Sequence, residues 1–453
     1  MVSGALAPPA RSMLTDSSIV EGLGETVGSE RIRSGAEIAS YRLGLLTPRV
    51  AAFPENEDDV ARLLAFACRE GLGVVPWGGG AHQSVGAIPA RYDVAIDLGR
   101  MDRLIEHEPA DMTATAQAGI RMAELDRCLE RHDQFLPLDP PLLSRATLGG
   151  LLASRLSGPL ACSYGTARDL ILGLRIAQAD GTVIRAGSKV VKNASAYDMT
   201  KLYLGSYGTL GVILEATFRV HPRPTVEKGW WIAVPDLESS LAVGIRILRS
   251  SLVPSRTELV DGPALRVLGG PPTDSALLVS IAGVAEAVAG QASDLALLAA
   301  EFGLTLVEFQ PPEGGWAAVA DFPWINPAFS GTGRRAIWRA SVLPTECARA
   351  MRDVRQAVDR CAEATMIASV SQGAVRGAFY AESLEAIGQS LAAAREALKA
   401  IGGILVILEV PDSLRSECDM WGVVPSASGL MQRLKAAVDP KRILNPGRFV
   451  NGM

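Results

Sequence analysis

The stretch Val74-Val75-Pro76-Trp77-Gly78-Gly79-Gly80-Ala81-His82 decides the fold, because a short apolar strand runs directly into three successive glycines. A second short strand is predicted at 94–98, so the glycine loop joins strand to strand. Glycine has no Cβ, and a phosphate can therefore approach the backbone N–H groups of such a loop closely. An ordinary turn is the open alternative for this stretch taken alone.

A second pair of glycines, Gly149-Gly150, opens a short helix after the proline-rich segment 135–141. If the two turns lie together, both would present backbone N–H groups to one ligand with two phosphates. Spacing excludes two common nucleotide folds. The dinucleotide fingerprint needs a third glycine where Gln83 stands, and a Walker loop needs a Gly-Lys-Ser/Thr sequence that this loop lacks.

Length and composition limit the class of protein. The chain has 453 residues, 48% hydrophobic and 21% charged, which is enough for two or three cores. Its net charge of −5 and its lack of a basic block argue against a nucleic-acid partner. The six cysteines form no Cys-x-x-Cys pair, which argues against zinc, iron–sulfur clusters and a secreted disulfide framework.

No window of ~18 apolar residues is present to span a membrane. We therefore expect a cytoplasmic protein that reaches the inner face of the membrane only through partners.

The pattern along the chain predicts four segments. Residues 1–45 read as an irregular N-terminal leader, 46–222 as an α+β lobe, 223–415 as a second lobe, and 416–453 as a C-terminal segment that returns to the first lobe. The boundary is His221-Pro222-Arg223-Pro224, because prolines two apart interrupt both helix and central strand. In the second lobe, strands alternate with helices, which predicts an open sheet covered on one side.

The motifs resemble the FAD-binding domain of the vanillyl-alcohol oxidase and p-cresol methylhydroxylase (PCMH) superfamily. The resemblance rests on the glycine loop, the second glycine turn and these further motifs: Leu138-Asp139-Pro140, Tyr164-Gly165, 205–213, Asp439-Pro440 and Leu444-Asn445-Pro446-Gly447-Arg448. Within the superfamily, residues 189–193 and 197–202 are similar to the FAD-binding E subunit of bacterial glycolate oxidase. The resemblance implies an α+β fold: a two-lobed PCMH-type FAD-binding domain plus an α/β-sandwich cap.

The resemblance also implies where FAD would bind. Ala81 stands where some members link FAD covalently to a histidine, and His82 is one step on, so we expect non-covalent FAD. No metal site is implied, and no catalytic residue is assigned. The implied cofactor-binding residues are Gly78, Gly79, Gly80, Ala81, His82, Asp139, Pro140, Thr147, Gly149, Gly150, Ser154, Gly158, Gly165, Gly211, Val212 and Ile213.

The implied activity is that of an FAD-dependent oxidoreductase of glycolate oxidase type, acting on the CH–OH group of a 2-hydroxy acid. The similarity to the E subunit implies a complex with a catalytic flavoprotein subunit and an iron–sulfur subunit. Two alternatives stay open: a self-sufficient FAD-linked dehydrogenase of another alcohol or hydroxy acid, and a non-catalytic FAD-binding scaffold.

The cap has no histidine, because none of the four histidines lies beyond His221. Oxidation of a hydroxy acid ordinarily uses a base near neutral pH, for which histidine is the usual residue. In the catalytic D-type relatives a histidine-containing site lies in the cap, and nothing here matches it. Arg339, Arg376 and Tyr380 are the cap candidates for holding a substrate carboxylate, with solvated surface arginines as the alternative.

Overall fold

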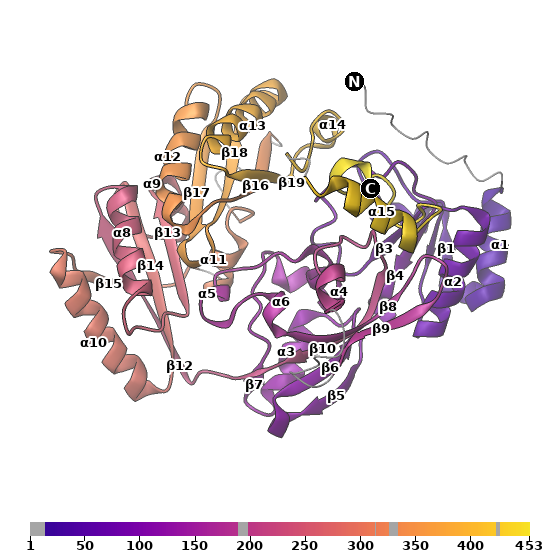
Figure 1. The fold of residues 1–453 in the computed structure, drawn as a ribbon, viewed down its shortest axis with the longest axis horizontal. Coiled ribbons are helices and arrows are strands. Elements are labelled where there is room, and N and C mark those ends of the chain that lie inside the picture. The colour runs from indigo at the N-terminus through magenta and orange to yellow at the C-terminus, as the bar shows by residue number, and fades with distance from the viewer. Residues whose placement is uncertain (1–13, 189–197, 313, 326–333, 423–425) are drawn as a thin grey trace.

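The computed structural model describes residues 14–188, 198–312, 314–325, 334–422 and 426–453. Two lobes lie side by side, one built from the N-terminal half with the C-terminal tail and one from the residues between them (Figure 1). Each lobe has its own hydrophobic core. The first is formed by buried residues between Ile19 and Ala186 and between Tyr203 and Val220, with Ile443 and Leu444, and the second by described residues between Trp230 and Met420. The expected α+β class is confirmed.

The glycine loop belongs to a four-stranded sheet of the first lobe, with strand order β1-β2-β4-β3. Its strands are β1 (Ile32–Ser34), β2 (Val50–Ala52), β3 (Val74–Trp77) and β4 (Val94–Asp97). β3 and β2 both run parallel to β4. Helix α2 (Glu57–Glu70) begins at Asn56, whose side chain accepts from the Asp59 amide, and ends at Gly71 in the left-handed conformation.

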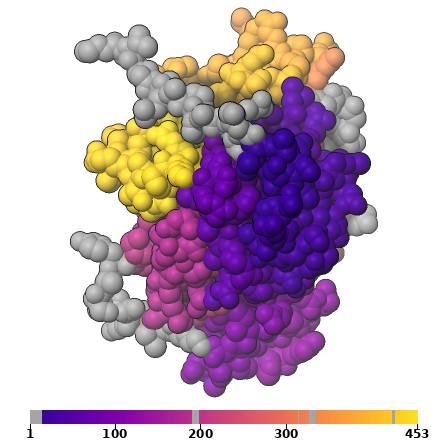
Figure 2. Space-filling model, turned by 90° about the vertical axis from the view of Figure 1, so that its right-hand side faces the viewer, coloured from indigo at the N-terminus to yellow at the C-terminus, as the bar shows by residue number. Residues whose placement is uncertain are grey.

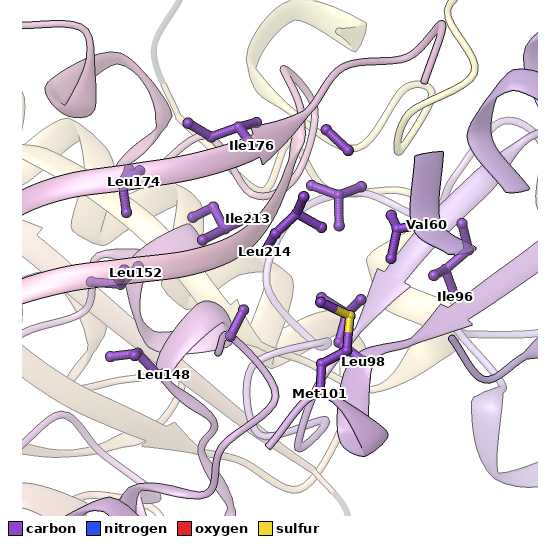
Figure 3. Close-up of a cluster of buried hydrophobic side chains, with 14 of the residues drawn as sticks. Val60, Ile96, Leu98, Met101, Leu148, Leu152, Leu174, Ile176, Ile213 and Leu214 are labelled. Atoms are coloured by element: carbon purple, nitrogen blue, oxygen red, sulfur yellow. The ribbon is translucent and has the colours of Figure 1, made fainter. Parts of the chain in front are cut away.

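An antiparallel five-stranded sheet completes the first lobe, in the order β5-β6-β10-β8-β9. The core between the two sheets brings Val60 and Ile96 toward Leu98, Met101 and Leu214 (Figure 3). The strands are β5 (Leu104–Glu108), β6 (Thr113–Gln117), β8 (Ile171–Ala177), β9 (Val183–Gly187) and β10 (Val212–Arg219). A two-stranded pair, β7 (Gln134–Phe135) with β11 (His221–Pro222), lies beside them.

The prediction of an irregular leader is wrong for the described part of residues 1–45. Helix α1 (Asp16–Val27) forms there, with Thr15 as its N-cap. Ile19, Leu23 and Val27 recur every fourth residue and are buried in the first core. This short apolar stripe lies among glycines and serines, so composition alone concealed it.

The short helices of the first lobe and tail connect these sheets. They are α3 (Met122–Glu130), α4 (Leu148–Ser154), α5 (Ala161–Tyr164), α6 (Ala167–Leu170), α7 (Thr200–Tyr203) and α15 (Ser428–Val438). Helix α14 (Asp412–Arg415) contributes Leu414 to the second core. Among the described helices, none combines the length and the apolar composition that a membrane span requires.

The second lobe is an eight-stranded sheet with helices against it, ordered β15-β12-β14-β13-β17-β18-β16-β19. Its strands are β12 (Val226–Val234), β13 (Arg256–Asp261), β14 (Ser275–Gly283), β15 (Leu306–Glu308), β16 (Arg335–Ser341), β17 (Glu363–Ser369), β18 (Ala374–Tyr380) and β19 (Ile404–Glu409). Its helices are α8 (Leu237–Leu248), α9 (Gly262–Leu268), α10 (Ala285–Glu301), α11 (Trp316–Asp321), α12 (Cys347–Val358) and α13 (Leu384–Lys399).

One face of the cap sheet packs against α8, α10, α12 and α13, and the other is turned toward the first lobe (Figure 1). On that inner face, Ile337, Ala378 and Leu408 pack with Val85 and Leu156 of the first lobe. The sheet therefore closes over the first lobe, as a cap would.

The C-terminal tail returns to the glycine-loop sheet. The Val74 amide donates to the Ile443 carbonyl (2.7 Å), and the Asn445 amide donates to the Val74 carbonyl (2.8 Å). The Lys435 ammonium is 1% exposed and donates to Asp439 (2.6 Å), Thr209 O (2.7 Å) and Leu444 O (2.9 Å). Figure 2 shows the tail, in yellow, packed against residues of the N-terminal half.

We predict that Lys435→Met destabilises the protein by about 3 to 5 kcal/mol, because it leaves the Asp439 carboxylate buried without its cation. Denaturant unfolding measures the change. The control is Lys399→Met, since that side chain is 77% exposed and should shift stability by less than about 0.5 kcal/mol. Equal effects of the two substitutions would contradict the role of the buried ion pair.

Candidate functional site

The glycine loop and the second glycine turn lie in direct contact. A Cβ added at Gly79 would stand 1.6 Å from the Arg145 carbonyl oxygen, and one at Gly78 would stand 2.2 Å from Thr147 Oγ1. Gly80 has a φ of +70°, in the left-handed region that favours glycine. Glycine is therefore required here by the close approach of two turns and by the backbone conformation.

The first turn supplies free hydrogen-bond donors. The backbone N–H groups of Gly78 to Ala81 donate to no other described residue, although this segment is folded between two strands. Backbone donors left unpaired in this way are costly unless water or a ligand accepts from them. The loop therefore presents a row of N–H groups to whatever occupies the adjoining space.

The second turn behaves differently from the expectation that both turns offer N–H groups. The Leu148 amide donates to the Ile120 carbonyl (3.0 Å), the Gly149 amide to Ala118 O (2.8 Å) and the Gly150 amide to Thr147 Oγ1 (3.3 Å). These bonds tie α4 to the end of β6 and use the donors internally. A Cβ at Gly149 would lie 2.7 Å from Ala118 Cβ, so Gly149 allows close packing, and neither Gly149 nor Gly150 offers a free N–H group to a ligand.

A cavity, named here the cofactor cavity, lies between the two turns and reaches the tail. The predicted residues Gly78, Gly79, Gly80, Ala81, His82, Thr147, Gly149, Gly150, Ser154, Gly211, Val212 and Ile213 all line it. Segments more than 130 positions apart in the sequence are thus brought to one cavity.

The other predicted residues lie elsewhere. Asp139 and Pro140 line a neighbouring cavity of about 590 Å³ at the junction of the lobes. Gly158 packs against Asp139, where a Cβ would meet the Asp139 carbonyl oxygen at 1.7 Å. Gly165 is the left-handed residue between α5 and α6. The Asp139 carboxylate accepts from the Leu160 amide (3.0 Å), and burial raises the pKa of Asp139 to about 7.

The cavity also contains residues absent from the predicted set: Gln83, Tyr207, Gly208, Asn445 and Arg448. They fall within motifs that carried the resemblance, the 205–213 segment and the tail, or next to the glycine loop. The sequence signal was therefore present, but nothing in it said that the tail would reach the loop.

Arg448 is the charged residue of this lining. Its guanidinium donates to Gln83 O (2.8 Å), Val85 O (2.9 Å) and Gln83 Oε1 (2.7 Å), while Nε has no partner among the described residues. Burial lowers the pKa of Arg448 to about 9, which leaves it charged at neutral pH. No carboxylate appears in the described lining, so the free amides and one guanidinium suit an anionic diphosphate such as that of FAD.

His82 joins the glycine loop to the proline-rich turn. Its Nε2 lies 3.0 Å from the Pro141 carbonyl oxygen, which can only accept, so Nε2 carries the proton and donates. Burial, assisted by the charge of Arg145, lowers the pKa of His82 to about 4. The ring is therefore neutral at pH 7 and does not act as a cation toward a phosphate.

The three cap candidates have different surroundings. Arg376 is 3% exposed and donates to Glu258 Oε2 (2.8 Å) and Ala320 O (2.9 Å), so the expectation that it holds a substrate carboxylate is wrong. Tyr380 is buried in the apolar contact between the lobes. Arg339 on β16 lies within electrostatic range of Tyr207, which lines the cofactor cavity, and burial lowers the pKa of Arg339.

Part of the motif shared with the E subunit, residues 189–197, lies outside the described residues. This includes the sequence from Lys189 to Asn193 and Tyr197.

Two protein families match this chain: one described as FAD binding domain, over residues 48–187, and one described as FAD linked oxidases, C-terminal domain, over residues 423–449. Glycolate oxidase subunit GlcD of Bacillus subtilis is 24% identical over 424 residues, 89% of each chain. The mitochondrial D-lactate dehydrogenase [cytochrome] of Arabidopsis thaliana is 33% identical over 239 residues, which cover 53% of this chain and 42% of that protein. The D-2-hydroxyglutarate dehydrogenase of Stutzerimonas stutzeri is 28% identical over 196 residues, 43% of this chain and 42% of that protein.

Solved structures share the fold. p-Cresol methylhydroxylase with bound substrate superposes with a TM-score of 0.78 at 16% identity, covering 97% of this chain and 98% of that chain. Alkyldihydroxyacetonephosphate synthase superposes with a TM-score of 0.77 at 19% identity, covering 98% and 87%. Both lobes are thus part of one known architecture.

We predict that Gly150→Asp abolishes retention of FAD, while Gly150→Asn retains it. Gly150 is exposed to the cofactor cavity, and a Cβ there has as its nearest neighbour Thr147 Oγ1 at 3.2 Å. The two side chains have nearly the same shape, so their difference isolates the repulsion between a carboxylate and the diphosphate. Flavin content after gel filtration measures it, and equal flavin content in the two variants would contradict this assignment of the cavity.

We predict that the neutral His82 makes the protein less stable at low pH. Its pKa is about 4 folded and about 6.5 unfolded, so the unfolded state binds more protons as pH falls between these values. Between about pH 7 and pH 4.5 the wild type should lose roughly 2 to 3 kcal/mol more than His82→Gln. Asp139 and Asp261, whose raised pKa values act in the opposite direction, cancel in this difference. Parallel pH profiles for the two proteins would refute the neutral-ring assignment.

Proposed function

Since this chain is an FAD-linked oxidoreductase with the fold of p-cresol methylhydroxylase, we propose that it takes part in the oxidation of a 2-hydroxy acid to the 2-oxo acid. The observation that carries the proposal is the cofactor cavity itself, with free amides and one guanidinium, in a chain whose relatives are named for glycolate, D-lactate and D-2-hydroxyglutarate.

When bound, FAD supplies a two-electron acceptor. The hydroxy acid gives up the hydrogen on C2 with its electron pair, and its hydroxyl gives up a proton. In this chain, the Gly78–Ala81 amides and Arg448 would hold the diphosphate, and the cap sheet would exclude water from above.

The substrate carboxylate is assigned to Arg339. Of the two predicted cap arginines, Arg339 forms no ion pair with a described carboxylate. It lies on β16 of the cap sheet, within electrostatic range of Tyr207. A guanidinium offers two parallel donors to a carboxylate.

The lack of a suitable base for the substrate hydroxyl in the described lining favours a multi-subunit enzyme. Burial raises the pKa of Tyr207 to about 12, so its hydroxyl is protonated at neutral pH and can donate but not accept a proton from substrate. His82 has a pKa of about 4 and is hydrogen bonded to Pro141, and the cap has no histidine. Among the described residues that line this cavity, none is a base of suitable pKa, and this fits an E-like role beside a catalytic flavoprotein.

The glycolate oxidase subunit named above is a D subunit, so the E-like role rests on residues 189–193 and 197–202 and on the lack of a base in the described lining of the cavity. An iron–sulfur subunit would then carry electrons onward, since the six cysteines form no Cys-x-x-Cys pair. The proposed place is the cytoplasm, at the inner face of the membrane through these partners. A self-sufficient dehydrogenase and a non-catalytic scaffold are the alternatives.

Anaerobic flavin reduction distinguishes these proposals. We expect the isolated chain, loaded with FAD, to lose its visible flavin absorbance slowly with glycolate, D-lactate or 2-hydroxyglutarate, and the chain purified with its natural partners to lose it rapidly. Arg339→Met in that complex should raise KM for the hydroxy acid about tenfold or more, as loss of a charged hydrogen bond predicts.

Rapid reduction of the isolated chain would instead establish the self-sufficient dehydrogenase. A complex that contains an iron–sulfur protein but in which no 2-hydroxy acid reduces this chain's flavin would establish the scaffold and refute the oxidoreductase role.

A further inference from the structure

A second cavity borders the glycine loop, and we name it the arginine cavity. It measures about 730 Å³ and shares Trp77 to Gly80 and Gln83 with the cofactor cavity. The rest of its lining comes from distant parts of the chain: the segment 40–44, Ser84, Asp97, Arg121, Arg145, and Asp412 and Arg415 of α14.

The charges in this cavity are unbalanced. Four guanidiniums line it, those of Arg42, Arg121, Arg145 and Arg415, against the carboxylates of Asp97 and Asp412. None of the four guanidiniums lies within ion-pair distance, 4.0 Å, of a carboxylate in the part of the chain that the structure describes. The local excess of positive charge stands in a chain whose net charge is −5.

Three of these guanidiniums, those of Arg42, Arg121 and Arg415, donate to carbonyl oxygens. Arg121 Nη1 donates to the Arg145 carbonyl (3.0 Å), which itself lies against Gly79. Arg415 is 4% exposed and donates to Gly86 O (2.9 Å) and Gln83 O (3.0 Å). A carbonyl dipole satisfies a donor without neutralising its charge, so the buried Arg415 keeps its charge, while Arg42, Arg121 and Arg145 are exposed at the mouth of the cavity.

The two carboxylates offset part of this charge, and four guanidiniums against two carboxylates leave an excess of two positive charges. Burial lowers the pKa of Arg415, and the charge of Asp412 opposes that shift by raising it. Asp97 accepts from the Tyr41 hydroxyl (2.5 Å) and the Gly99 amide (2.7 Å), and Asp412 is exposed at the start of α14. The cofactor cavity adds a further cation, because Arg448 donates to the same Gln83 carbonyl as Arg415 (2.8 Å). Burial, and after it the positive charge of Arg415, lower the pKa of Arg448, as expected where two buried guanidiniums share one acceptor.

The FAD diphosphate accounts for one side of the loop only. Gly78 to Gly80 line both cavities, whereas Ala81 and Arg448 line the cofactor cavity alone, where a diphosphate would match them. The excess positive charge of the arginine cavity is left over, on a concave, polar space that four guanidiniums and two carboxylates line.

We propose that the arginine cavity binds a second, small anion that carries phosphate groups. Guanidinium is the side chain best shaped for phosphate, because its planar fork donates two parallel hydrogen bonds. The proposal goes beyond the oxidation of a hydroxy acid and does not depend on it. The phosphate groups could belong to inorganic pyrophosphate or to a nucleoside triphosphate, which share this chemistry.

Calorimetric titration of the FAD-saturated protein tests the site with inorganic pyrophosphate and with ATP as probes. We expect saturable binding of one anion per chain, weakened by added salt. The double variant Arg121→Gln/Arg145→Gln should weaken binding about tenfold or more. The control, Arg131→Gln/Arg168→Gln, removes two exposed arginines outside this cavity and should leave affinity unchanged.

Tighter binding of ATP assigns the site to a nucleotide, and equal or tighter binding of pyrophosphate assigns it to the diphosphate group alone. Absence of binding by either probe overturns the proposal, and so does equal binding by the double variant and the control. Release of flavin during the titration, or loss of FAD from the double variant, would also overturn it, because the arginines would then serve the cofactor.

Discussion

The cofactor cavity depends on the close approach of two turns, the glycine loop and the second glycine turn. Gly79 meets the Arg145 carbonyl and Gly78 meets Thr147 so closely that no side chain fits between them. This contact fixes where the first turn lies. Of the two turns, only the first has free backbone amides, because the Leu148 and Gly149 amides of the second donate to the Ile120 and Ala118 carbonyls. The cofactor cavity is what remains between two turns held this close.

The tail closes the same region from a distant part of the sequence. The Lys435 ammonium donates to the Asp439 carboxylate and to two carbonyls. This ion pair stabilises the tail segment in which the Asn445 amide donates to the Val74 carbonyl. The same packing places the Arg448 guanidinium against the Gln83 carbonyl, beside the glycine loop. The positive charge of the cavity thus depends on the packing of residues more than 350 positions away, and the arginine cavity repeats the arrangement with segments from both ends of the chain.

The FAD cofactor, the α+β fold and the lining around the glycine turns could be predicted from sequence, because each rests on local motifs with defined backbone demands. What could not be predicted depends on tertiary pairing. Strand β13 is fully buried although Arg256, Glu258 and Asp261 are charged, and charged residues ordinarily indicate exposure. Their partners, among them Arg376 for Glu258, lie on strands and helices far along the chain. For the same reason Arg376 looked available to a substrate. The domain boundaries and the role of each site residue remain predictions.

A crystal structure of the FAD-loaded chain tests the central claim most directly. The account predicts the diphosphate within hydrogen-bond distance, about 3 Å, of the amides of Gly78 to Ala81, with the Arg448 guanidinium on the same side. The second turn should contact it through Thr147 or through the bare surface of Gly150 rather than through the Gly149 amide. A diphosphate held away from the first turn would contradict the account, whatever the position of the flavin ring.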